Sequence, residues 1–116
     1  MEISTQQKET VSILKLTGEL DASNAVVVDE ELIQILEKKP SHIWVDGTEI
    51  SYISSAGLGV FLSHLHTIQQ QQIKFVFFGL NAKIKSVFNI LGLDTLVQMA
   101  DNLEELTANC KLDLQA

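Results

Sequence analysis

The sequence predicts a single α/β domain built on one mixed, mostly parallel sheet of four to five strands, with helices mainly on one face. Short β-branched and aromatic runs alternate with longer amphipathic segments, which is typical of strand–helix units in parallel sheets. Only a short gap, at residues 8–10, separates the first two candidate strands, which favours a hairpin and therefore a mixed sheet. The length of 116 residues suits one domain, and we assign residues 1–116 to it.

The first half of the chain predicts two strands, a helix and a third strand. Residues 3–7 form a short candidate strand, and residues 11–16 form a second that ends at Gly18. Residues 42–45 are a short apolar run, closed by Asp46 and Gly47, and predict a buried strand. A helix is expected between the second and third strands. Its candidate N-caps are Asp21 and Ser23. Its expected buried positions are Val26 or Val27, Ile33 and Leu36.

The second half of the chain predicts two further strands and three helices. A helix after the serine pair has an apolar stripe that we expect to be buried, at Leu58, Phe61, Leu62, Leu65 and Ile68. Residues 73–78 predict a strand closed by Gly79. The next helix is expected to be capped by Asn81 and to carry apolar residues at Ile84, Val87, Phe88 and Leu91. Residues 96–99 predict a last strand, and Asp101 or Asn102 begins a terminal helix.

Composition argues against several classes of partner. The net charge is −7, and all eight basic residues are lysines, so nucleic acid and anionic lipid are poor ligands. No apolar run approaches the roughly 18 residues of a membrane span, and the first residues lack the apolar core of a secretory signal. The single cysteine, Cys110, cannot form an internal disulfide, which suits a reducing compartment. We therefore expect a cytoplasmic protein without membrane insertion.

The residues that could support catalysis do not form a recognisable site. His64 and His66 are two positions apart and point to different sides of a helix, so we expect no metal site. The segment from Ser54 to Gly57 does not match the Gly-x-Ser-x-Gly pattern of a nucleophile elbow. A phosphoacceptor receiver domain remains an alternative, with Glu19, Asp21 and Asp46 as its carboxylates, although no lysine follows a late strand as that class requires. We expect no catalytic residue and no cofactor.

The informative segment is DGTEISYISSAGLGV at residues 46–60, where a serine pair begins a helix. Serine is a favoured N-cap, so both serines could simply cap this helix. The segment nevertheless resembles the motif of STAS domains, specifically of bacterial anti-sigma-factor antagonists, in which Asp-Ser-Ser/Thr-Gly-Leu-Gly opens a helix. LTGELD at residues 16–21, FFGL at 77–80 and LGL at 91–93 resemble the family's other motifs in the same order.

This resemblance implies a regulatory function. Such antagonists bind an anti-sigma factor that is also a serine kinase, are released when phosphorylated on a serine at the start of the second helix, and are reset by a serine phosphatase. The phosphorylated serine of the family matches Ser55, with Ser54 as second choice. Ser54 replaces the motif's Asp, and Ala56 replaces its second Ser/Thr. The alternative is a non-switching STAS adaptor subunit, for example of a lipid-transport complex.

The expected partner-binding residues surround this serine pair. A helical wheel places Val60 on the outward side of the second helix, one turn from Ser55. A glycine at position 59 would let a partner's backbone approach closely, while Gly57 is also explained by packing of the helix on the sheet. The predicted surface consists of Asp21, Ser54, Ser55, Gly57, Gly59 and Val60.

Overall fold

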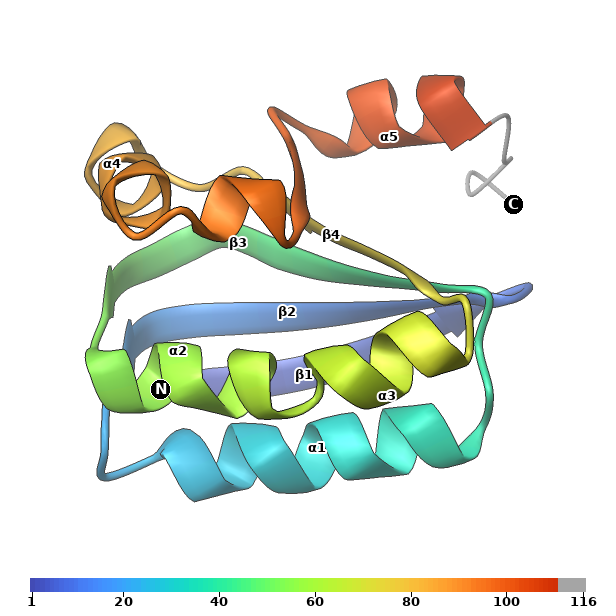
Figure 1. Cartoon of the computed structure of the whole chain (residues 1–116), viewed down its shortest axis with the longest axis horizontal. Coiled ribbons are helices and arrows are strands. Elements are labelled where there is room, and N and C mark those ends of the chain that lie inside the picture. The colour runs from blue at the N-terminus through green and yellow to red at the C-terminus, as the bar shows by residue number, and fades with distance from the viewer. Residues whose placement is uncertain (111–116) are drawn as a thin grey trace.

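The structure is a computed structural model that describes residues 1–110, with side chains through residue 106 (Figure 1). The side chain of Cys110 and residues 111–116 of the assigned domain lie outside the described part. In chain order the elements are β1 (Glu2–Lys8), β2 (Val11–Leu20), α1 (Ala25–Glu37), β3 (His42–Ile53), α2 (Ser55–Ser63), α3 (Leu65–Gln70), β4 (Lys74–Phe78), α4 (Ala82–Ile90), the 3₁₀ turn η1 (Leu93–Thr95), β5 (Gln98–Ala100) and α5 (Leu103–Cys110).

The five strands form one sheet in the order β1-β2-β3-β4-β5. β1 and β2 are an antiparallel hairpin, and every later pairing is parallel. The expected α/β class with a mixed, mostly parallel sheet is therefore confirmed. β3 is much longer than expected, because it continues beside β2 through the polar residues after Val45, while register shifts between the two strands absorb the irregularity.

The main hydrophobic core lies between the sheet and the layer of α1, α2 and α3, with α4 closing one end (Figure 1). Phe77 of β4 is at its centre. The ring of Phe77 meets those of Phe61 and Phe88 edge to face, at centroid distances of 5.0 and 5.2 Å. Such aromatic pairs add roughly 0.5–1.5 kcal/mol to the stabilisation from burial alone. These contacts fix α2 and α4 against the same strand.

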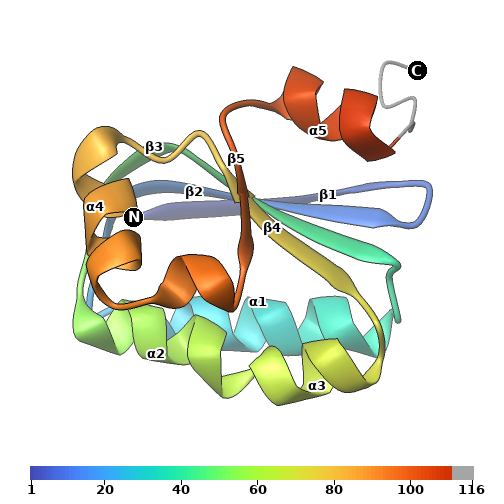
Figure 2. The same ribbon diagram turned by 45° about the horizontal axis from the view of Figure 1, so that its top comes forward.

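A second, smaller core lies on the opposite face of the sheet, beneath α5 (Figure 2). Trp44 of β3 is fully buried there, and Leu106 of α5 covers it together with neighbouring strand residues. Asn102 accepts a hydrogen bond from the backbone N–H of Glu105, so it caps α5, one of the two starts expected. Helices thus lie mainly, but not solely, on one face, as predicted.

The buried face of α1 differs from the one predicted. Its buried residues are Val28, Leu32, Ile35 and Leu36, which follow the i, i+4, i+7, i+8 pattern of one face. Val26, Val27 and Ile33 are exposed, so the expectation for these three was wrong. The N-cap is Asn24, not Asp21 or Ser23, and its side chain makes no capping bond within the helix. Apolar residues occur on both faces of α1, which is why periodicity alone selected the wrong one.

The second predicted helix is interrupted at His64 and forms the two helices α2 and α3. Leu58, Phe61 and Ile68 are buried as expected, whereas Leu65 is only half-buried. Leu62 is 39% exposed, so the prediction that it is buried was wrong. Leu62 is the last residue but one of α2 and lines a small recess beside Phe88 of α4 and Leu93 of η1.

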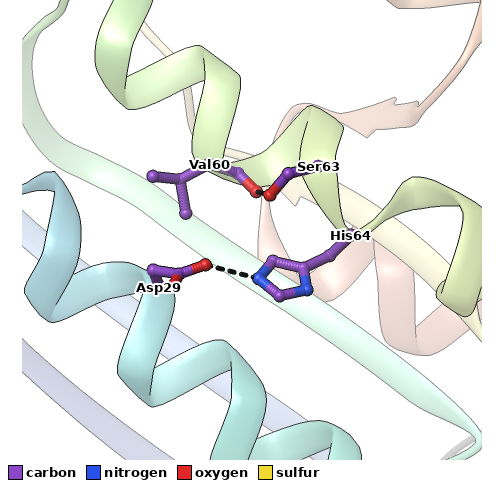
Figure 3. A network of polar contacts seen from close by, with 4 residues as sticks. All are labelled: Asp29, Val60, Ser63 and His64. Carbon is purple, nitrogen blue, oxygen red and sulfur yellow. Dashed lines mark hydrogen bonds and ion pairs between the residues drawn. The ribbon is translucent and has the colours of Figure 1, made fainter.

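His64 joins the interruption to α1 (Figure 3). Its Nε2 lies 2.6 Å from Oδ1 of Asp29, and the histidine is largely buried. The hydroxyl of Ser63, the residue before His64, donates to the carbonyl oxygen of Val60 at 2.7 Å. This bond occupies a carbonyl at the end of α2, as side chains at helix ends commonly do. The contact between His64 and Asp29 holds the end of α2 against α1, and the Ser63 bond completes the last turn of α2 itself.

His42 makes stability depend on pH. Burial, and secondarily the charge of Lys74, lower the pKa of His42 below the ordinary value of about 6.5. At a pH between the lowered pKa of His42 in the folded chain and its ordinary pKa in the unfolded chain, the unfolded chain binds more protons. Stability therefore falls as the pH drops below about 6.5. We expect His42→Gln to flatten the fall in melting temperature between about pH 7.5 and about pH 5.5. Wild type and His42→Gln have the same carboxylates, so these contribute equally to both pH profiles. Profiles of melting temperature against pH that run parallel would therefore contradict this role of His42.

Candidate functional site

The serine pair lies at the end of the sheet where β2 and β3 finish side by side. These strands run parallel, so their carboxyl ends meet at one edge, where binding sites of α/β folds commonly form. The backbone N–H of Ser54 donates to the carbonyl oxygen of Leu20 at 2.8 Å. This bond places the start of α2 directly beside the loop that leads from β2 into α1.

Ser54 is the N-cap of α2. Its backbone is extended, with ψ of 171°, and its Oγ accepts a hydrogen bond from the backbone N–H of Gly57 at 3.2 Å. Its carbonyl oxygen accepts the N–H of Leu58 at 3.0 Å, which begins the helical ladder. The Ser54 hydroxyl is therefore engaged in the fold and only half exposed.

Ser55 is the first residue of α2 and has a different environment. Its side chain is exposed, and within the described residues its hydroxyl makes no hydrogen bond. The N–H groups of Ser55 and Ala56 belong to the first turn, where no intrahelical acceptor exists. These groups and the helix dipole make the surroundings of Ser55 favourable to negative charge. The hydroxyl is thus accessible to an external reagent at an electropositive helix end.

Asp21 lies in the adjoining loop and is ionised. Its Oδ1 accepts hydrogen bonds from the hydroxyl and the backbone N–H of Ser23. These two bonds lower the pKa of Asp21 below its usual range, and the bond from the hydroxyl has the larger effect. Asn24 holds the loop by accepting from the N–H of Asp21 at 3.0 Å and donating to the carbonyl of Glu19 at 2.9 Å. The fold thus presents a fixed negative charge next to the start of α2.

The two glycines of α2 have different roles. Gly57 is buried, and a Cβ on it would lie 2.6 Å from Cγ of Leu20. Packing on the sheet therefore explains Gly57, which offers no surface to a partner. Gly59 is exposed, and nothing lies within 4 Å of a Cβ built there. Only Gly59 belongs to the outer face of the helix.

Val60 does not face outward as the helical wheel suggested. It is half-buried and packs against the main core, on the side of α2 nearest α1 (Figure 3). The outer face instead follows Ser55, Gly59 and Leu62, at i, i+4 and i+7. Sequence reasoning missed Leu62 because the interruption at His64 cannot be recognised from apolar spacing.

The described residues offer neither a metal centre nor a membrane span. Among residues 1–106, no three histidine, cysteine or acidic side chains gather closely enough to hold a metal ion. In the part of the chain that the structure describes, no helix is both long and apolar enough to cross a bilayer. The family to which the chain belongs decides whether it is the receiver domain that the sequence left as an alternative.

The sequence model of the STAS domain matches residues 2–106. The chain belongs to the STAS domain family. It is 32% identical over 109 residues to the anti-sigma-B factor antagonist of Listeria monocytogenes, an alignment that covers 94% of this chain and 95% of that protein. The family assignment made from residues 46–60 and the flanking motifs is thereby confirmed.

Solved structures agree on the fold. A candidate anti-sigma factor antagonist from Thermotoga maritima superposes with a TM-score of 0.87 at 23% identity, over 95% of each chain. The Bacillus antagonist SpoIIAA is similar in its unphosphorylated form, with a TM-score of 0.80 at 15% identity over 97% of this chain and 99% of that one. At these identities the likeness concerns the fold alone.

The glycines of α2 give a matched pair of substitutions. Gly57→Ala should lower the free energy of unfolding by about 1–3 kcal/mol, because the new methyl group overlaps Leu20 in a packed region. Gly59→Ala should raise it by about 0.5–1 kcal/mol, because alanine favours helix and meets open space. Urea unfolding of both variants measures the difference. Equal effects of the two substitutions would contradict the packing role of Gly57.

Proposed function

We propose that this chain is an anti-sigma-factor antagonist that binds an anti-sigma serine kinase and is released when that kinase phosphorylates Ser55. The observation that carries the proposal is the difference between the two serines. The Ser54 hydroxyl is bound to the N–H of Gly57, whereas the Ser55 hydroxyl is exposed and, within the described residues, unbonded. A kinase needs an accessible hydroxyl, and Ser55 provides one.

Phosphorylation at Ser55 is compatible with a folded domain. A phosphate adds about −1.5 to −2 charges at neutral pH, and the first turn of a helix accommodates an anion through its free N–H groups. The relative SpoIIAA has been solved in a phosphorylated form that keeps this fold, with a TM-score of 0.75 to this chain. The phosphate therefore acts on the interface, where a hydrated dianion would have to lose its water against the partner.

The proposed docking face is built from Asp21, Ser55, Gly59 and Leu62, with Leu62 taking the place expected for Val60. The ionised carboxylate of Asp21 suits a basic group of the partner. Gly59 lets the partner's backbone come close, and Leu62 adds an exposed apolar contact. Ser54 contributes by fixing the start of α2 rather than by direct contact.

The remainder of the circuit follows from the same proposal. A serine phosphatase removes the phosphate and restores the binding form, and the chain itself catalyses neither step. It needs no cofactor, and its acidity makes nucleic acid and anionic membranes poor partners. The proposed location is the cytoplasm, where a sigma factor and its regulators act.

Phosphate incorporation tests the acceptor. In an extract of the source organism supplied with ATP, wild type and Ser54→Ala should each gain one phosphate, and Ser55→Ala should gain none, as measured by mass spectrometry of the intact protein. Ser54→Ala is the matched control, and it should cost about 1 kcal/mol of stability through loss of the cap. Incorporation into Ser55→Ala at the wild-type level would reject Ser55. Loss in Ser54→Ala alone would move the acceptor by one residue.

Partner capture tests the binding half of the proposal. Immobilised wild-type chain should retain an ATP-binding anti-sigma factor from the same extract, and Ser55→Asp should retain much less, because the added charge imitates part of the phosphate. The retained protein is identified by mass spectrometry. Equal retention by both chains, with no phosphorylation of either, would favour the non-switching adaptor.

A further inference from the structure

Exposed apolar side chains are concentrated around α4 and the neighbouring surface of α2. Ile90 is 80% exposed, and other large apolar residues with substantial exposure on these elements and beside them are Tyr52, Leu62, Val87, Leu91 and Leu96. A scattered exposed apolar residue needs no explanation, but a cluster on a small domain commonly marks an interaction site. α4 lies at the same end of the molecule as the start of α2, the helix that begins with Ser55 (Figure 2).

Within this cluster lies a small apolar groove between α2 and α4, of about 70 Å³. We call it the α2–α4 groove. It is lined by Ser51, Tyr52, Ile53, Leu58, Lys83, Ile84, Val87 and Phe88. A water molecule occupies about 30 Å³ in the liquid. A groove of this volume is therefore larger than one water molecule and can hold part of one side chain.

We propose that the α2–α4 groove receives an apolar side chain of the same partner that covers Ser55, and that a carboxylate beside that side chain meets Lys83. This inference rests on the proposed function. The argument for this occupant is continuity, because the groove wall formed by residues 51–53 leads directly into Ser54 and Ser55. Leu58, on the next turn of α2, lines the groove as well. A protein that covers Ser55 therefore reaches the groove without leaving the surface.

The charges specify the partner further. Lys83 is exposed at the rim of the groove, and within the described residues it has no ion pair, although the chain carries a net charge of −7. Asp21 lies in the β2–α1 loop, on the other side of the start of α2 (Figure 1). A partner with a basic group for Asp21 and an acidic group for Lys83 can dock in only one orientation. Such complementary charges give specificity more than affinity.

Two matched substitutions test the groove. The probe is the purified anti-sigma factor retained by the wild-type chain, titrated by calorimetry. Val87→Glu should weaken binding roughly tenfold, the effect of a contact that matters at an interface. The control, Ile33→Glu, replaces an apolar residue of α1 that is 42% exposed, against 38% for Val87, and lies farther along α1 from the loop of Asp21, so it should bind like wild type. A thermal melt of each variant checks the fold.

A charge reversal at Lys83 provides a second measurement that leaves the apolar lining of the groove unchanged. Lys83→Glu places an acid in the first turn of α4, where it favours the helix, so the domain should remain folded. It should weaken binding at least severalfold, whereas Lys38→Glu at the far end of α1 should have little effect. Binding of Val87→Glu and Lys83→Glu at wild-type affinity, while Ser55→Asp abolishes binding, would overturn the groove alone. Failure of the wild-type chain to bind any anti-sigma factor would instead overturn the proposed function and the groove with it.

Discussion

The close contact between Gly57 and Leu20 is the constraint on which the functional end of this molecule depends. Only a residue without a side chain lets α2 approach the end of β2 closely enough for the N–H of Ser54 to reach the carbonyl of Leu20. That bond sets where α2 begins, and the capping bond of Ser54 sets its direction. The exposed Ser55 and the ionised Asp21 become neighbours as a result, although 34 residues separate them in sequence.

Local chemistry made much of the fold predictable. Asn81 was expected to cap α4, and its Oδ1 accepts the N–H of Ile84 at 2.9 Å. The alternation of strands and helices led to the correct class because parallel pairing requires crossover helices. The buried face of α1 was missed because its valines and isoleucines occur on both sides, and only contact with the sheet selects between them. The interruption at His64 was missed because its partner, Asp29, is 35 residues away.

The candidate site was predictable to a different extent. Serine before a helix indicates a cap, and the family motif favoured Ser55 as the acceptor with Ser54 as second choice, but only the structure identifies Ser54 as the cap. Asp21 was expected either to cap α1 or to face a partner, and the structure gives it a turn with Ser23 instead of a cap. Tyr52 and Leu62 could not be assigned to the surface, because their exposure depends on the extension of β3 and on where α2 ends. Contacts with residues distant in sequence, rather than the local pattern, decide whether such positions are exposed.

The nature of the cap on α2 has a consequence for how this domain responds to its medium. A carboxylate at position 54 would stabilise the helix start through a charge that salt screens and acid neutralises. Salt and moderate acid leave the hydroxyl of Ser54 unchanged, because it is uncharged across the physiological range. The capping bond that fixes the position of Ser55 is therefore insensitive to ionic strength and to moderate acidification. Any dependence of affinity on salt then reports the charges at the interface rather than a change in the helix that carries the acceptor.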